Sequence, residues 1–226
     1  MSHTAAPLPE PIARALRILR RQRWIAREAL GHDPPGCKHH PEEASMEENL
    51  RRVLAAIERA GASWALVGAE AVNLYVGPRA TEDFDLVVAA GGFEAALREI
   101  RLEFNGPPEV DIGAAVRLPT LAIDLIRSSC HELFRIAIDR ARPAGPMRVP
   151  PPEVVMALKF LSSISPWRHE DDRKQDALDL IRVYRAVGRE GDRAELLRLG
   201  GLAYPGAERE LGELLGKIDR GEPITI

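Results

Sequence analysis

The pattern of apolar and polar positions predicts an α/β part that is followed by a purely helical part. Between residues 46 and 148, short apolar runs rich in β-branched residues alternate with stretches in which apolar residues recur every three or four positions. The first pattern is typical of strands and the second of amphipathic helices. After residue 149 only the helical pattern occurs. Alternating elements followed by helices alone indicate an α/β core with an all-helical second part.

Individual elements can be assigned from the same pattern. Ser45, with Glu48 three residues later, matches the capping box that begins a helix. Strands are expected at 64–67, 84–89, 116–118 and 121–126. Helices are expected from Ser45 to about Gly61 and at 69–75, 93–100, 131–141, 153–164, 171–187, 193–199 and 207–218. The last two strands are expected to pair across a turn at Pro119 and Thr120. We therefore divide the chain into 1–45, 46–148 and 149–226.

Residues 1–45 are interpreted as an N-terminal extension that carries a basic amphipathic helix. Apolar residues recur along one stripe between Pro9 and Leu30, and prolines then end the helix. Arginines lie to the sides and back of the stripe at positions 14, 17, 20, 21 and 27. Three roles stay open for this helix, which could dock on the rest of the protein, lie on RNA or bind a partner.

Composition excludes some classes of function. Lys and Arg number 31 against 34 Asp and Glu, which gives a formal net charge of −3, so no overall basic field favours bulk binding of nucleic acid. The two cysteines, Cys37 and Cys130, do not make a disulfide framework. No apolar leader and no run of about eighteen apolar residues occurs, so neither secretion nor membrane insertion is expected. The expected location is the cytoplasm.

Three acidic residues are the main candidates for chemistry. Asp83 and Asp85 are one residue apart beside an apolar strand and share one of its faces, because side chains alternate with period 2. Asp124 is a lone charge in the apolar strand 121–126 and would complete a cluster if the two strands were neighbours. A divalent metal is the usual compensation for such charges. The alternative is that these acids lie at edges or helix caps and pair with arginines.

The turn at Gly68 and Ala69 suggests what such a metal site would act on. A small-residue turn between a strand and a helix lets the backbone approach a triphosphate closely. Transfer of phosphoryl and nucleotidyl groups by two metal ions requires hard oxygen ligands for Mg²⁺. The pattern therefore suggests a nucleotide polyphosphate held between the turn and the carboxylates.

A family resemblance agrees with this interpretation. Gly68-Ala69, followed by Arg79-Ala80-Thr81-Glu82-Asp83-Phe84-Asp85-Leu86, resembles the signature of the minimal nucleotidyltransferases of the polymerase β superfamily. The branch that the chain resembles most is the AbiEii/MenT-type nucleotidyltransferases, toxins of bacterial toxin–antitoxin and phage-defence systems. Later parts of the pattern correspond to Asp124, to Lys159 and to the stretch Arg173-Lys174-Gln175-Asp176-Ala177-Leu178-Asp179-Leu180.

The resemblance implies a fold, a reaction and partners. It implies a nucleotidyltransferase fold, with a small mixed β-sheet flanked by helices and followed by a helical bundle. The reaction would be transfer of NMP from an NTP to an acceptor hydroxyl, on an RNA or tRNA 3′ end or on a protein side chain. A small-molecule acceptor, as for antibiotic-modifying nucleotidyltransferases, is a variant with the same core. The cofactor would be two Mg²⁺ ions, which Mn²⁺ could replace, and a cognate antitoxin could be a partner.

The resemblance also implies residue roles. Asp83, Asp85 and Asp124 would bind metal, Lys159 would contact the nucleotide phosphates, and Asp176 would be a further essential acid. Gly68, Ala69, Arg79 and Thr81 would contribute to nucleotide binding.

Other interpretations of these residues stay open. Arg79 and Thr81 could instead cap and brace the loop before the acids. Lys159 could be a lysine whose stem is buried at a domain boundary while its charge reaches solvent. Asp172, Asp176 and Asp179 could form a solvated face of ion pairs on one helix.

Two departures from the family pattern leave a second function open. Ala69 stands where the family has a second Gly or a Ser, and Gln175 separates a Lys-Asp pair that is usually adjacent. The alternative function is therefore a catalytically weak or inactive nucleotidyltransferase-fold module that binds a partner or regulates it.

Overall fold

The computed structural model describes residues 46–76, 79, 81, 83–187 and 191–224. Ser45, the predicted helix cap, and the predicted basic helix of the N-terminal extension lie outside the described residues. The predicted roles of the extension therefore stay predictions.

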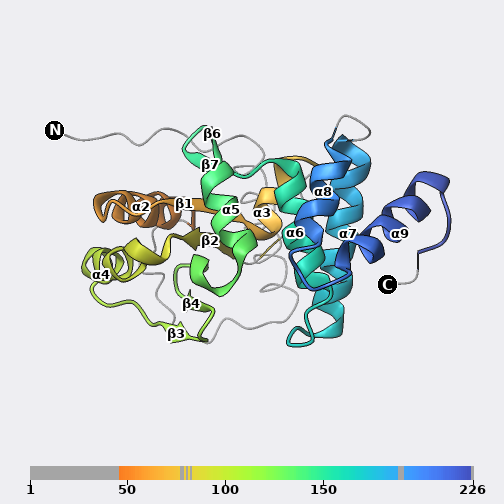
Figure 1. Ribbon diagram of the computed structural model, residues 1–226. Coiled ribbons are helices and arrows are strands. Elements are labelled where there is room, and N and C mark those ends of the chain that lie inside the picture. Colours follow the sequence, from red (N-terminus) through yellow and green to blue (C-terminus); the bar gives the residue numbers. More distant parts are fainter. Residues whose placement is uncertain (1–45, 77–78, 80, 82, 188–190, 225–226) are drawn as a thin grey trace.

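A five-stranded mixed sheet forms the centre of the α/β part (Figure 1). Its strand order is β1-β2-β5-β4-β3. The strands are β1 (Trp64–Val67), β2 (Phe84–Val88), β5 (Ile123–Arg127), β4 (Ala115–Leu118) and β3 (Val110–Asp111). Only the central pair, β2 and β5, runs parallel. The predicted α/β class with a small mixed sheet is confirmed.

Helices surround this sheet. The helices α2 (Met46–Arg59) and α4 (Phe93–Glu103) pack side by side at one end of the molecule (Figure 1). The helix α5 (Glu132–Arg140) packs against β1 and β2, and the short α3 (Gly68–Asn73) follows β1 directly. Two 3₁₀ turns, η1 (Ala90–Gly92) and η2 (Ser128–Cys130), follow β2 and β5.

Among its described residues, the C-terminal part consists of four helices, as the sequence predicted. They are α6 (Pro152–Ser163), α7 (Glu170–Val187), α8 (Arg193–Gly200) and α9 (Ala207–Arg220). The helix α6 packs against α7 and α8 on one side and against α3 and α5 on the other, so it joins the helices to the sheet part. Buried apolar residues form one core cluster that runs from Leu50 in α2 to Leu215 in α9.

Three features differ from the prediction, and the first is the short strand β3, which was not expected. The Pro/Gly-rich connection before α6 contains a hairpin, β6 (Arg142–Ala144) and β7 (Met147–Val149), whose second strand packs beside β1. The strand β5 begins at Ile123 instead of Leu121, because Ala122 takes a left-handed conformation with φ 55° and ends the turn after β4. The predicted pairing of the two strands across Pro119 and Thr120 is confirmed.

No helix among the described residues combines the length and the apolar character that crossing a membrane requires.

Candidate active site

The parallel pairing of β2 and β5 brings two of the predicted acids together. Asp85 and Asp124 are direct partners in the register of these strands, so their side chains lie on the same face at adjacent positions. Asp83 immediately precedes β2, two residues before Asp85. All three line one cavity of about 380 Å³, whose wall also includes Ala69, Arg79, Thr81, Lys159 and Asp176. The sheet therefore gathers the residues that the sequence singled out.

Burial and a neighbouring negative charge raise the pKa of two of these carboxylates, those of Asp85 and Asp124. Burial, with a further contribution from the charge of Asp83, raises the pKa of Asp85 to about 7, and the Lys159 ammonium opposes this shift. Burial and the charge of Asp83 also raise the pKa of Asp124, while Arg117 lowers it. Burial is the larger cause of both shifts, and the contribution from Asp83 adds repulsion between negative charges to it.

The donor set suits a hard divalent cation. Three carboxylates at one cavity supply the oxygen ligands that Mg²⁺ prefers. Within the described part of the chain, however, no three Asp, Glu, His or Cys side chains converge closely enough to form a ready-made metal site. The residues fit the metal in chemistry, and their side chains would have to draw together around it.

Asp85 is the reason that residue 68 is a glycine. Gly68 begins α3 with φ 66°, a left-handed conformation that favours glycine. A Cβ atom at this position would overlap Oδ2 of Asp85. The absence of a side chain at Gly68 therefore makes room for the carboxylate of Asp85. This need for glycine does not depend on a contact between the backbone and a ligand. Ala69, which follows, is buried and lines the cavity.

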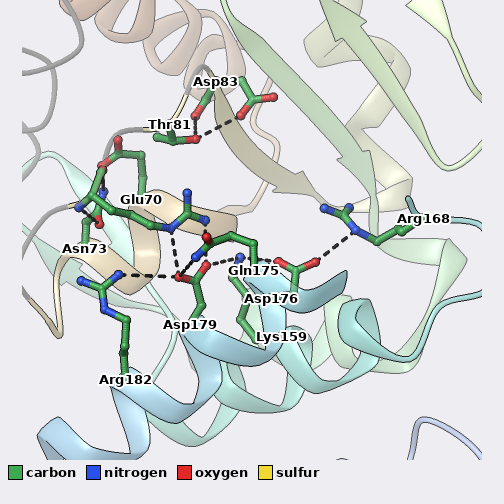
Figure 2. A network of polar contacts seen from close by, with 11 residues as sticks. Glu70, Asn73, Thr81, Asp83, Lys159, Arg168, Gln175, Asp176, Asp179 and Arg182 are labelled. Carbon is green, nitrogen blue, oxygen red and sulfur yellow. Dashed lines mark hydrogen bonds and ion pairs between the residues drawn. The ribbon is translucent and has the colours of Figure 1, made fainter. Parts of the chain in front are cut away.

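The residues of the loop before β2 are held by the protein itself. Nε and Nη2 of Arg79 donate hydrogen bonds to Oδ1 and Oδ2 of Asp179 at 2.9 and 2.7 Å. The Asn73 side chain accepts from N of Arg79 and donates to its carbonyl oxygen. Thr81 Oγ1 lies 3.4 Å from Oδ1 of Asp83, as Figure 2 shows. These contacts favour the interpretation that Arg79 and Thr81 brace the loop and orient Asp83.

Lys159 is buried within the helical part of the site (Figure 2). Its Nζ donates to Oδ1 of Asp176 at 2.7 Å and lies 2.9 Å from Oδ2 of Asp179. The interpretation as a lysine whose charge reaches solvent is wrong, since 8 % of the side chain is exposed. The interpretation of the α7 acids as a solvated face is wrong for Asp176 and Asp179, which are buried, and holds only for the exposed Asp172.

Asp179 is the residue that sequence reasoning underestimated. It has no exposed surface and contacts Arg79, Lys159 and Gln175. Burial raises its pKa, but the hydrogen bond from Arg79 and the charge of Lys159 outweigh that effect, so the pKa is lowered overall. Gln175, which interrupts the family pattern, donates to Asp179 at 3.2 Å and so takes part in the network. The available signal was the placement of Asp179 beside the apolar Leu180 and three residues after Asp176.

Three further polar residues of the site were not predicted. Glu70 in α3 is buried and accepts a hydrogen bond from Asn73, and burial raises its pKa to about 7. Arg168 lies between α6 and α7, and its Nε is 3.1 Å from Oδ2 of Asp176. Arg117 in β4 is the register partner of Asp124, and its Nε is 3.3 Å from Oδ2 of that residue. Nothing in the local sequence distinguishes these arginines from the many others.

Comparison with known proteins gives weak similarities. No protein-family model and no curated protein matches the chain. Among solved structures, the solution structure of the antibiotic-resistance factor ANT(2'')-Ia aligns with 17 % identity over 77 % of this chain and 96 % of that one, with a TM-score of 0.47. The crystal structure of ANT(2'')-Ia in complex with adenylyl-2''-tobramycin aligns with 14 % identity over 72 % of this chain and 96 % of that one, with a TM-score of 0.45.

A third structure is an antigenic nucleotidyltransferase-like protein from Paracoccidioides brasiliensis. It aligns with 16 % identity over 76 % of this chain and 91 % of that one, with a TM-score of 0.41. Similarities of this size do not assign a function, so the function has to be inferred from the site.

Proposed function

We propose that this protein is a nucleotidyltransferase that transfers NMP from an NTP to an acceptor hydroxyl. The observation that carries the proposal is the pairing of Asp85 with Asp124 on adjacent parallel strands, with Asp83 beside them at the same cavity. Carboxylates concentrated in this way carry a repulsion that a purely structural role would not require. Phosphoryl-transfer chemistry uses such a set to hold divalent cations.

The proposed reaction is a substitution at the α-phosphorus of the NTP. The acceptor oxygen forms a bond to the α-phosphorus, and the bond from that phosphorus to the oxygen bridging to the β-phosphate breaks. Pyrophosphate leaves with the electron pair of the broken bond. The proton of the acceptor hydroxyl passes to a base, and the candidate is Asp124, which lies at the cavity beside Asp85.

Asp83, Asp85 and Asp124 would hold two Mg²⁺ ions, or Mn²⁺ in their place. When bound, these ions would stabilise the charges on the attacking and leaving oxygens. Gly68 keeps the space that Asp85 needs, and the Arg79–Asp179 contact holds the loop that carries Asp83. Ala69 lines the wall of the cavity next to this turn. Lys159 faces the same cavity and places positive charge opposite the three acids, while Asp176 fixes its ammonium.

The nature of the acceptor follows from the sequence resemblance alone. An RNA 3′ end, particularly of tRNA, or a protein side chain is the proposed acceptor class. A toxin or phage-defence role, with a cognate antitoxin as partner, has the same basis. The cavity is open and polar, as an acceptor entering from solvent requires.

A second candidate function is a catalytically weak or inactive module that binds a partner. One observation favours it: Lys159 is already neutralised by Asp176 and Asp179, so its charge is shared before any nucleotide binds. The absence of a hydroxyl at Ala69 points the same way. The three acids at one cavity weigh against it.

The test is transfer of label from α-labelled NTPs. The protein is incubated with each NTP, Mg²⁺ and either total RNA or total protein, and labelled products are separated by gel. We expect label on one acceptor class with the native chain and with Asp139→Asn, which alters an exposed acid on α5. Asp83→Asn and Asp124→Asn should abolish labelling. Absence of labelling with every NTP, together with no Mg²⁺-dependent NTP binding, would favour the inactive module.

A further inference from the structure

Four cationic side chains of the described residues line the cavity of the three acids. They are Arg79, Lys159, Arg117 and Arg168. The sequence resemblance assigns nucleotide binding to the first two. Arg79 and Lys159 are more buried than Arg117 and Arg168, and each is held by two short contacts to carboxylate oxygens instead of one. This difference decides which of the four can bind an incoming anion.

Arg79 and Lys159 are committed to the protein. Arg79 makes a two-pronged contact with Asp179, which has no exposed surface. Lys159 contacts both Asp176 and Asp179 at less than 3 Å. Removing either cation from its carboxylates would leave a buried charge without its partner, which is costly. These two cations therefore stabilise the site in place and contribute to an anion only at long range.

Arg117 and Arg168 are held loosely. Their side chains are 56 % and 46 % exposed, and each contacts a single carboxylate, at 3.3 and 3.1 Å. Oδ2 of Asp176, which faces Arg168, has no hydrogen-bond partner, so that contact is an ion pair without hydrogen-bond geometry. The arginine end of each pair is open to solvent, whereas the side chains of Asp124 and Asp176 are 17 % and 5 % exposed. An arginine that leaves therefore regains its hydration, and the cost of breaking the pair falls on the carboxylate.

The carboxylates that these arginines leave are not equally affected. Asp176 keeps its 2.7 Å hydrogen bond from Lys159 when Arg168 moves away. Asp124 contacts Arg117, and Asp124 is also one of the acids that would bind a divalent cation. When Arg117 leaves, Asp124 therefore loses this cationic contact. A divalent cation bound to Asp124 would then replace the lost positive charge.

We propose that Arg117 and Arg168 are the residues that bind the polyphosphate of the nucleotide, by exchanging Asp124 and Asp176 for phosphate oxygens. This inference rests on the proposed function for the identity of the anion. The guanidinium group suits it, because a planar fork of donors matches two phosphate oxygens. The two arginines come from β4 in the sheet part and from the loop between α6 and α7, so a bound polyphosphate would connect both parts of the protein.

The test is equilibrium binding of inorganic tripolyphosphate, measured by isothermal titration calorimetry at a fixed excess of Mg²⁺. Tripolyphosphate has no transferable nucleotide, so the measurement is independent of NMP transfer. The variants are Arg117→Gln and Arg168→Gln, each with the corresponding Lys variant. The matched control is Arg101→Gln, because Arg101 is 45 % exposed and also paired with one carboxylate, that of Glu109, away from the cavity.

We expect each Gln variant to weaken binding on the order of tenfold, and each Lys variant to weaken it less. Arg101→Gln should bind as the native chain does. The inference is overturned if the native chain does not bind tripolyphosphate, or if both Gln variants bind it as tightly as the control. Label transfer with unchanged tripolyphosphate binding in the variants would reject the arginines and keep the proposed function. If the variants bind tripolyphosphate more weakly but the native chain transfers no label, the role of the arginines is supported and the proposed function is rejected.

Discussion

Oδ2 of Asp85 occupies the space that a side chain on Gly68 would need. The strand β1 ends at Val67 and runs antiparallel to β2, with Val67 opposite Asp85, so the first residue after β1 passes directly over that carboxylate. A small residue at this turn is therefore required by the acid beside it. This requirement exists before any phosphate binds, and it makes the turn and the acid one structural unit.

Gly68→Ala should destabilise the protein more than Gly61→Ala. Both glycines have nearly the same φ, 66° and 65°, but no atom lies within 4 Å of a Cβ built on Gly61. Gly61→Ala should cost about 1–2 kcal/mol for the left-handed conformation. Gly68→Ala should cost a further 1–3 kcal/mol, roughly, from the overlap. Urea denaturation measures both free energies of unfolding.

The double variant Gly68→Ala with Asp85→Ala separates the overlap from the backbone cost. Removal of the carboxylate should lower the cost of the alanine at position 68 toward that of Gly61→Ala, with a remainder because Cβ of Asp85 lies 2.9 Å from the added atom. A cost at position 68 that does not change when Asp85 is shortened would show that the two residues do not compete for space.

Asp179→Asn should destabilise the protein strongly. The substitution leaves Arg79 and Lys159 with a neutral partner at a fully buried position. Breaking a buried ion pair from one side typically costs about 3–5 kcal/mol. Asp172→Asn, on the exposed face of the same helix, should change the free energy of unfolding by less than about 1 kcal/mol. Equal effects in the two variants, measured by chemical denaturation, would contradict a structural role for the buried network.

The contact between α5 and α8 should make stability depend on acid pH. Hydrogen bonds from Arg198, and beyond them the charge and hydrogen bond of Arg140, lower the pKa of Glu195 from 4.5 to about 2. A lowered pKa means that the stabilisation is complete above pH 4.5 and is lost as the pH falls from 4.5 toward 2. Because both arginines are substantially exposed, its size should be about 1 kcal/mol.

Glu195→Gln tests this dependence. The difference in free energy of unfolding between the native chain and the variant should be present at pH 7 and should shrink below pH 4.5. Glu58→Gln, which alters an exposed residue of α2, should show no such change. A difference that stays constant from pH 7 to pH 3 would mean that the ionised Glu195 adds nothing to stability.

Arg117→Gln should strengthen the binding of Mn²⁺ in the absence of nucleotide. The guanidinium contacts Asp124 at 3.3 Å and competes with a divalent cation for the same carboxylate. Its removal should tighten Mn²⁺ binding severalfold, whereas Asp124→Asn should weaken it. Titration followed by electron paramagnetic resonance of free Mn²⁺ gives both constants. Weaker Mn²⁺ binding in Arg117→Gln would show that the arginine supports the cation site.

The part of this site that sequence could predict depends on short-range regularities. Period-2 alternation placed Asp83 and Asp85 on one face and marked Asp124 as a charge in an apolar strand. The pairing of Asp85 with Asp124 could only be supposed, because it depends on a parallel register between strands that lie far apart in the sequence. The partner of Arg79 is 100 residues away, and no local pattern identifies it.

There are also physical reasons why some features of the structure were not predicted. Pro143 argued against a strand at β6, but a proline is tolerated in this two-stranded hairpin, where only one neighbour requires hydrogen bonds. Asp176 and Asp179 look the same in sequence whether their face of α7 meets water or Lys159. Tertiary packing decides whether such charged side chains are buried. The periodicity of the sequence does not show this packing.

Two acids of the site and the cation Arg168 are carried by different kinds of structure. Asp85 and Asp124 are fixed by strand pairing, whereas Arg168 sits in a connection between two helices. Connections accept substitutions and changes of length more readily than paired strands do. The consequence for the proposed function is evolutionary: changes around Arg168 would alter which nucleotide binds, while the paired acids proposed to carry the transfer would stay in place with the sheet.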